Sequence, residues 1–123
     1  MSRPLPVLHG IPNCDSVRKA RAWFDTQGIA YTFHDLRRQG VPTGALSGWC
    51  QQQGWQTLLN RKGTSWRALD EACRTGVVDE ASACALMASQ PALIKRPVIT
   101  WPDGQVSVGL DLDNFQRRAA ALD

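Results

Sequence analysis

The fold is decided by residues 5–35, which read LPVLHGIPNCDSVRKARAWFDTQGIAYTFHD. The run Leu5–His9 is short and apolar and ends at Gly10, which is typical of a strand. A helical pattern follows over Asp15–Gln27, and apolar alternation over Ile29–Asp35 predicts a second strand. Crossovers of this kind are nearly always right-handed and join parallel strands. The stretch therefore predicts a parallel pair of strands with one helix across it.

The rest of the chain supplies helices and then a hairpin. The stretch of about residues 42–90 shows no strand pattern and is cut by glycines, so we interpret it as a helical insertion. It is expected to hold short helices over Thr43–Gln53, Trp55–Asn60, Ser65–Arg74 and Asp79–Gln90. Strand patterns return at 97–101 and 105–108 around a Pro-Asp-Gly turn and predict a β-hairpin. A helix is expected over Asp111–Leu122.

Length and composition limit the classes of protein. The chain has 123 residues, which predicts one domain over 1–123. Its 14 Lys and Arg against 11 Asp and Glu give 14 − 11 = +3, too weak a charge to indicate nucleic-acid binding. No apolar run approaches the roughly 20 residues that a membrane-spanning helix needs. The segment that begins at Met1 lacks the apolar core of a secretory signal. We expect a cytoplasmic protein with no membrane or nucleic-acid partner.

Four cysteines are the residues with the most chemistry. They are Cys14, Cys50, Cys73 and Cys84. They form no C-x-x-C pair, so the sequence predicts no metal site. With no export signal they are expected to be reduced thiols. The question is whether one of them is reactive.

Cys14 occupies a special position, between the first strand and the first helix. Free N–H groups and the positive end of the helix dipole stabilise an anion there, so the thiol pKa is expected to fall. Arg18 follows one helical turn later and is expected to face the sulfur. Ser16 offers a hydroxyl, whereas Asp15 adds an opposing negative charge. We therefore predict that Cys14 is a nucleophile, with Ser16 and Arg18 in its anion site.

Three segments in order resemble a known family. They are Ile11–Arg21, Asn60–Arg67 and Ile94–Val98. Together they resemble the ArsC/Spx family, and within it the small YffB-type ArsC-like proteins. The resemblance implies a thioredoxin-like fold of the glutaredoxin type. This fold has a mixed four-stranded sheet flanked by helices, with a helical insertion before the C-terminal hairpin. It also implies a cis peptide bond before Pro97, close to the active cysteine.

The resemblance also implies chemistry at named residues. Arsenate reductases of this type attack arsenate with a thiolate, cradle the oxyanion with arginines and then use glutathione. By resemblance Cys14 is the nucleophile, and Arg61 and Arg96 bind the anion. A guanidinium suits this role because its planar fork matches oxyanion and carboxylate oxygens. Expected partners are glutathione or a small anionic substrate, with glutaredoxin as a further candidate. No bound cofactor is expected, and glutathione would be a co-substrate.

Departures from the family pattern decide between the alternatives. By resemblance, an arsenate reductase of this type would carry a third arginine on the second hairpin strand. Residues 105–111 of this chain contain no Lys or Arg. This favours a glutathione-dependent thiol oxidoreductase over an arsenate reductase, which stays as an alternative. A non-enzymatic Spx-like interaction protein is the other alternative, although Val17 stands where the Spx-type C-x-x-C motif has its second cysteine. Whether Cys50 or Cys73 resolves a disulfide at Cys14 stays open.

Overall fold

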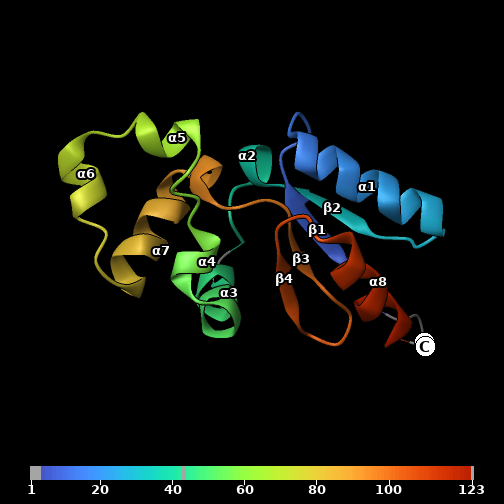
Figure 1. Cartoon of the computed structure of the whole chain (residues 1–123). Coiled ribbons are helices and arrows are strands. Elements are labelled where there is room, and N and C mark those ends of the chain that lie inside the picture. Colours follow the sequence, from blue (N-terminus) through green and yellow to red (C-terminus); the bar gives the residue numbers. More distant parts are fainter. Residues whose placement is uncertain (1–3, 43, 123) are drawn as a thin grey trace. The chain divides into compact units, whose positions relative to one another are not determined.

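The computed structural model describes residues 4–42 and 44–122, arranged as two compact units (Figure 1). The first unit comprises the chain up to Asp35 and from Arg96 onward, and the second comprises Leu36–Lys95. The second unit is longer at both ends than the predicted insertion of about 42–90. That the chain is a single domain stays a prediction.

The first unit contains a four-stranded sheet. Its strands are β1 (Val7–Gly10), β2 (Thr32–Asp35), β3 (Val98–Thr100) and β4 (Val106–Val108). The strand order is β2-β1-β3-β4, with β1 parallel to β2 and the other two pairs antiparallel. The predicted mixed sheet, with its parallel pair and its hairpin, is confirmed.

Both strands of the parallel pair begin later than the sequence predicts. The first starts at Val7 rather than Leu5, and the Pro6 carbonyl accepts a hydrogen bond from the Thr32 N–H at 2.9 Å. The second starts at Thr32 because Ile29 still belongs to the end of the preceding helix. Its N–H donates to the Phe24 carbonyl at 3.0 Å.

Two helices of the first unit pack with the sheet around one core (Figure 1). They are α1 (Asp15–Gln27) and α8 (Leu112–Ala120). The first ends where predicted because Gly28 adopts φ 69°, which favours glycine. The core comprises Leu8, Val17, Ala20, Phe24, Ile99, Trp101 and Phe115. These apolar contacts hold the start of α1 against β1.

The second unit is helical. Its elements are α2 (Leu36–Gln39), α3 (Ala45–Gln53), α4 (Trp55–Leu58), α5 (Thr64–Arg67), α6 (Glu71–Thr75), α7 (Glu80–Ser89) and the 3₁₀ helix η1 (Pro91–Leu93). Neither α2 nor η1 was expected from the sequence. The expected start of one helix at Thr43 lies outside the described residues. Within the described ranges, no helix is both long and apolar enough to cross a membrane.

The predicted helix over Ser65–Arg74 is wrong, since two short helices replace it. Asp70 separates them with an extended backbone, and its carboxylate accepts the N–H of Cys73 at 2.7 Å. An aspartate that caps a new helix satisfies an otherwise unpaired N–H group. The Arg74 guanidinium also donates to the carbonyl of Leu69 and so fixes the break between the helices.

Candidate functional site

The site begins with the loop that joins β1 to α1. The Cys14 N–H donates to the Ile11 carbonyl at 3.1 Å, which closes a tight turn. Just before this turn, Gly10 lies against α1 so closely that a Cβ there would be 2.6 Å from a methyl group of Val17. Because both Val17 and Ile11 are buried, the turn is held against the core. Cys14 is therefore placed by packing on both of its sides.

Cys14 is the N-cap residue of α1. Its backbone is extended, with φ −96° and ψ 130°, and its carbonyl accepts the first helical hydrogen bond from the Arg18 N–H at 2.9 Å. The side chain is half-buried. This position directs the sulfur toward backbone N–H groups that have no partner inside the helix.

The environment of the sulfur favours the thiolate. Partial burial acts to raise the pKa of Cys14. Hydrogen bonding from the Val17 N–H, hydrogen bonding and positive charge from Arg96, and hydrogen bonding from the Ser16 N–H together outweigh it, so the pKa is lowered. The sequence-based reason, an anion at a helix N-terminus, therefore contributes through two backbone groups. The charged side chain that contributes is Arg96.

Arg96 is held at the start of the hairpin. The peptide bond between Arg96 and Pro97 is cis, and Pro97 is fully buried. The Pro97 carbonyl accepts the N–H of Gly109 at 2.9 Å, which joins this end of β3 to the end of β4. The half-buried guanidinium that acts on Cys14 therefore belongs to a residue joined directly to the anchored Pro97.

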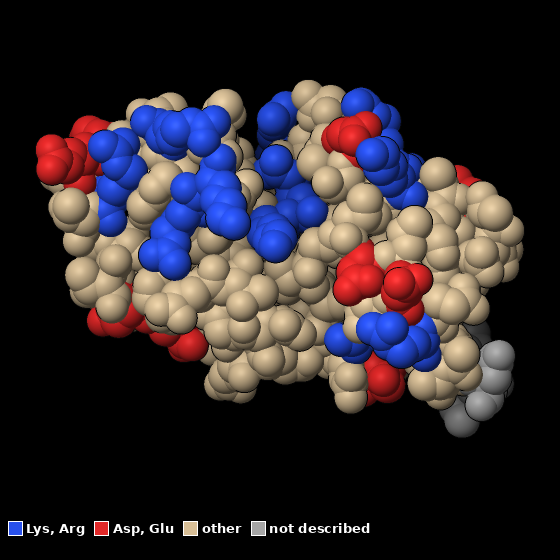
Figure 2. Space-filling model, viewed as in Figure 1, with Lys and Arg blue, Asp and Glu red and all other residues tan. Residues whose placement is uncertain are grey.

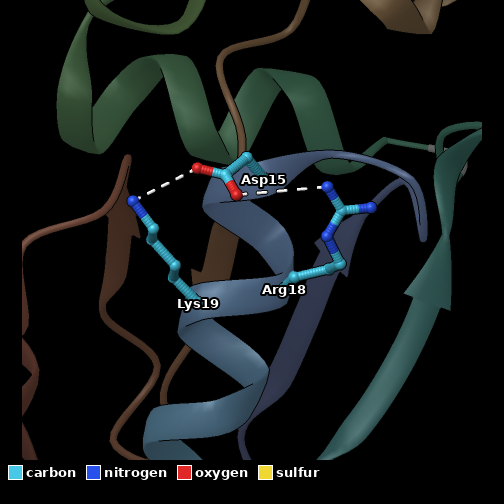
Figure 3. Close-up of polar contacts among 3 residues, drawn as sticks. All are labelled: Asp15, Arg18 and Lys19. Atoms are coloured by element: carbon cyan, nitrogen blue, oxygen red, sulfur yellow. Dashed lines mark ion pairs between the residues drawn. The ribbon is translucent and has the colours of Figure 1, made fainter.

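Arg18 forms an ion pair with Asp15, and its predicted place beside the sulfur stays a prediction. Its guanidinium pairs with the carboxylate of Asp15 at 4.0 Å, and Lys19 pairs with the same carboxylate at 3.2 Å (Figure 3). All three side chains are mostly exposed to solvent, so each pair is worth about 1 kcal/mol or less. Two cations therefore partly compensate the negative charge that Asp15 brings to the start of α1.

Ser16 is half-buried in the first turn of α1. Its backbone N–H, rather than the hydroxyl considered from sequence, is the group that acts on the pKa of Cys14. A backbone donor is retained whatever side chain stands at this position. The predicted role of the hydroxyl in anion binding stays a prediction.

Sequence reasoning gave no role to His9, which lies on β1 just before the loop. The ring is 5% exposed, and its Nδ1 atom lies 2.9 Å from the Val98 carbonyl on β3. The His34 ring on β2 lies 5.3 Å from it, between centroids. Burial lowers the pKa of His9 to about 4, partly opposed by the Val98 hydrogen bond and aided by His34. A neutral imidazole therefore helps to tie three strands together behind the cysteine loop.

Arg61 lies in the second unit, where it meets two other cations. Hydrogen bonds from the Asn60 N–H to Leu93 (2.8 Å) and from the Lys95 N–H to Leu58 (2.7 Å) join the middle of this unit to its C-terminal end. Together with Lys62, Arg61 and Lys95 line a cavity of about 350 Å³. Figure 2 shows several Lys and Arg side chains on the visible face of the helical unit.

Arg61 also lies over an aromatic ring. Its guanidinium carbon lies 5.8 Å from the centre of the Trp55 ring, within the range of a cation–π contact. The predicted anion-binding residue is thus exposed, cationic and part of a basic cavity. Among the described residues, no group of three or more Cys, His, Asp or Glu side chains is arranged to hold a metal ion.

Comparison with known proteins places these features in a family. The model of the ArsC family matches residues 9–117. An uncharacterised protein of Haemophilus influenzae is 37% identical over 110 residues, which are 89% of this chain and 95% of that protein. A solved YffB protein is 45% identical, with a TM-score of 0.85, and the match covers 92% of this chain and 97% of the other. A solution structure of an arsenate reductase-related protein from Brucella melitensis is 39% identical, with a TM-score of 0.72. The match covers 95% of this chain and 96% of that protein.

The mixed sheet with its flanking helices is a thioredoxin-like fold, which the solved relatives share. The family match extends over most of both units. The chain belongs to the ArsC family.

Proposed function

We propose that this protein is a glutathione-dependent thiol oxidoreductase in which the Cys14 thiolate is the nucleophile. The observation that carries the proposal is the position of Cys14 as the N-cap residue of α1, beside the Arg96 guanidinium, which favours the thiolate and lowers its pKa. Thiolates rather than thiols attack disulfides, so a lowered pKa increases the reactive fraction at neutral pH. Similarity to an arsenate reductase-related protein supports a small anion or a redox partner.

The proposed reaction has two exchanges. First, the Cys14 sulfur attacks the glutathione sulfur of a mixed disulfide, forms a new S–S bond and releases the substrate thiolate. Glutathione then attacks the glutathione sulfur now held on Cys14 and leaves as glutathione disulfide. The substrate sulfur is reduced to a thiol, the incoming glutathione is oxidised as it joins the first glutathione in a disulfide, and Cys14 returns to its thiolate. The Arg96 guanidinium compensates the charge on sulfur before the first attack and after the second.

Cationic and polar side chains would hold the carboxylates of glutathione. Arg96 acts on the sulfur itself, and Arg61 presents a guanidinium beside Lys62 and Lys95. Arginine binds carboxylates through two parallel N–H···O bonds, so within the second unit Arg61 is our proposed ligand for an anionic group. Arg18 and the Ser16 hydroxyl are weaker candidates, since Arg18 pairs with Asp15.

The absence of one cation separates this proposal from arsenate reduction. Residues 105–111, which include β4, contain no Lys or Arg that could serve as a third cation for the oxyanion. The half-buried Val108 lies on β4, the strand that would carry the third arginine in an arsenate reductase of this type. Asp15 is a weaker argument against arsenate than its sequence position indicates, because Arg18 and Lys19 pair with it.

The proposed reductant is glutathione itself, with glutaredoxin as the alternative donor to the Cys14 mixed disulfide. Such chemistry suits the cytoplasm, where the glutathione pool keeps thiols reduced. A glutathione-linked cycle needs one cysteine only. This agrees with Val17 at the position where a C-x-x-C motif would supply a second thiol.

The proposal is tested with glutathione disulfide and a small glutathionylated substrate. The wild-type protein should form a mixed disulfide at Cys14, found by peptide mass mapping, and should turn over when glutathione is supplied. Cys14→Ser should abolish both, because an alcohol is not ionised at neutral pH. Cys73→Ser is the matched control, since Cys73 is also half-buried, and should leave both unchanged. Turnover that survives Cys14→Ser would overturn the proposal.

A further inference from the structure

Two cysteines of the second unit lie side by side. Cys50 on α3 and Cys84 on α7 place their sulfur atoms 3.3 Å apart in a thiol hydrogen bond, although 34 positions separate them in the sequence. The helices that carry them pack against each other within this unit. From the sequence, both are expected to be reduced thiols, and Cys50 is considered only as a partner for Cys14. Neither thiol takes part in the proposed reaction.

The two sulfur atoms differ in their access to solvent. Cys50 is 3% exposed, next to the buried Trp49 in the same helix, whereas Cys84 is half-buried. A disulfide holds its sulfur atoms about 2.05 Å apart, so closing this pair needs an approach of only about 1.2 Å. A small shift of α3 against α7 would provide it.

We propose that Cys50 and Cys84 form a redox-sensitive dithiol that closes to a disulfide when hydrogen peroxide reaches the second unit. Cys84, the more exposed thiol, reacts first. Its sulfur attacks the O–O bond of the peroxide, and one S–O bond forms while water leaves, which gives a sulfenic acid. The Cys50 sulfur then attacks the Cys84 sulfur. The S–O bond breaks, and the hydroxyl leaves as water with the Cys50 proton. Two thiols and one peroxide thus give one disulfide and two waters.

The chemistry of Cys50 fits the second role rather than the first. Burial raises the pKa of Cys50 to about 12, aided by the hydrogen bond and charge of Cys84 and by the charge of Glu80. A buried thiol that stays protonated is a poor target for reagents in solution. It reacts with a neighbouring sulfenic sulfur because the two atoms are already adjacent, which raises their effective concentration. Cys50 therefore resolves the oxidised Cys84 and protects it from further oxidation.

The test uses the full chain with Cys14→Ser and Cys73→Ser, which leaves only this pair of thiols. After peroxide treatment, free thiols are counted in denaturant and tryptic peptides are mapped by mass spectrometry. We expect both thiols to disappear together, one peptide to link Cys50 to Cys84, and dithiothreitol to restore both thiols. Because Cys14 is absent, failure of this proposal is distinguishable from failure of the proposed function.

Further substitution of this two-thiol chain supplies the controls. With Cys84→Ala added, Cys50 should stay a free thiol after the same exposure; with Cys50→Ala added, Cys84 should pass to the sulfinic acid. Circular dichroism checks that each chain is folded. Loss of Cys50 in the Cys84→Ala chain would contradict the order of reaction. Cys84 sulfinic acid beside a free Cys50 in the two-thiol chain would overturn the proposal, as would linkage between chains instead of within one.

Discussion

The guanidinium of Arg96 acts on the sulfur of Cys14 through both a hydrogen bond and its positive charge. The two residues come from the two separate chain segments of the sheet-containing unit, Cys14 after β1 and Arg96 before β3. Strands β1 and β3 are neighbours, with His9 opposite Val98 in the register. Antiparallel pairing therefore brings the residue after one strand to the residue before the other. The anion site depends on this sheet register as well as on the helix N-terminus.

Replacing Arg96 tests this relationship. Arg96→Ala should raise the pKa of Cys14 and weaken glutathione binding, because it removes a charged donor. Arg96→Lys should restore the pKa more than the binding, since it keeps the charge but loses the planar fork. The measurements are thiolate absorbance against pH and a glutathione titration. Arg18→Ala is the control and should change the pKa less, because Arg18 is exposed and pairs with Asp15. A larger rise in the pKa of Cys14 from Arg18→Ala than from Arg96→Ala would show that Arg18, rather than Arg96, stabilises the thiolate.

Gly10→Ala should disturb the cysteine loop through a steric clash with Val17. The added Cβ would lie 2.6 Å from one Val17 methyl group and 3.0 Å from the other, and Val17 is fully buried and stiff. We expect a loss of about 1–3 kcal/mol in the free energy of unfolding, as for other overpacked cores. The pKa of Cys14 should rise as well, because the Val17 N–H moves away from the sulfur. Denaturant unfolding and the thiolate titration measure the two effects.

The same substitution elsewhere supplies the control. Gly48 lies inside α3, where an added methyl group would meet open space, and its φ is not in the left-handed region. Gly48→Ala should therefore stabilise the protein by about 0.5–1 kcal/mol, because alanine is the better helix former. Equal destabilisation by both variants would show that the contact with Val17 is not the cause.

Acid should destabilise the protein through His9. The pKa of His9 is about 4 when folded, against 6.5 for the ordinary group. Well above pH 6.5 both states are neutral and His9 contributes nothing to the pH dependence. As the pH falls from about 6.5 to about 4 the unfolded state binds the proton first, so up to about 3 kcal/mol of stability is lost.

His9→Asn isolates this contribution, since its amide can still donate to the Val98 carbonyl. The stability advantage of the wild type over His9→Asn should shrink by up to about 3 kcal/mol between pH 7.5 and pH 4, measured by denaturant unfolding. His34→Asn is the matched control on the neighbouring strand. A difference between wild type and His9→Asn that does not vary with pH would show that His9 accepts a proton in the folded state.

Arsenate should be a poor substrate. One charged hydrogen bond is worth about 1.5–3 kcal/mol, or ~10- to 150-fold in affinity, and β4 lacks the arginine that would supply it. Val108→Arg should therefore increase arsenate turnover, measured with glutathione as reductant, and Val108→Gln should not. Robust arsenate reduction by the unmodified protein would contradict the argument from the missing cation.

Local signals predicted much of the fold. Helix α1 has the predicted bounds because polar residues crowd its start and Gly28 ends it with a left-handed backbone. The same signals failed where side chains compete for backbone groups. Asp70 caps a second helix inside a segment whose apolar spacing predicts one, and Ile29 completes the end of α1 instead of starting a strand.

The features of the site also divide into those that local sequence predicts and those that depend on tertiary packing. The position of Cys14 at a helix N-terminus follows from nearby residues, so its lowered pKa was predictable in direction. Which cation assists was not, because the one-turn spacing favoured Arg18 and only strand pairing brings Arg96 to the sulfur. The pairing of Cys50 with Cys84 depends on how α3 packs against α7, and no local pattern encodes it.

The central claim is that Cys14 is the activated thiol, and the pH dependence of its alkylation tests it most directly. Iodoacetamide is added in limiting amount at a series of pH values, and each cysteine peptide is quantified by mass spectrometry. We predict that Cys14 is labelled fastest at neutral pH, with a midpoint below that of a free cysteine derivative measured in the same buffers. A midpoint at or above that reference, or faster labelling of Cys50 or Cys73, would contradict the account.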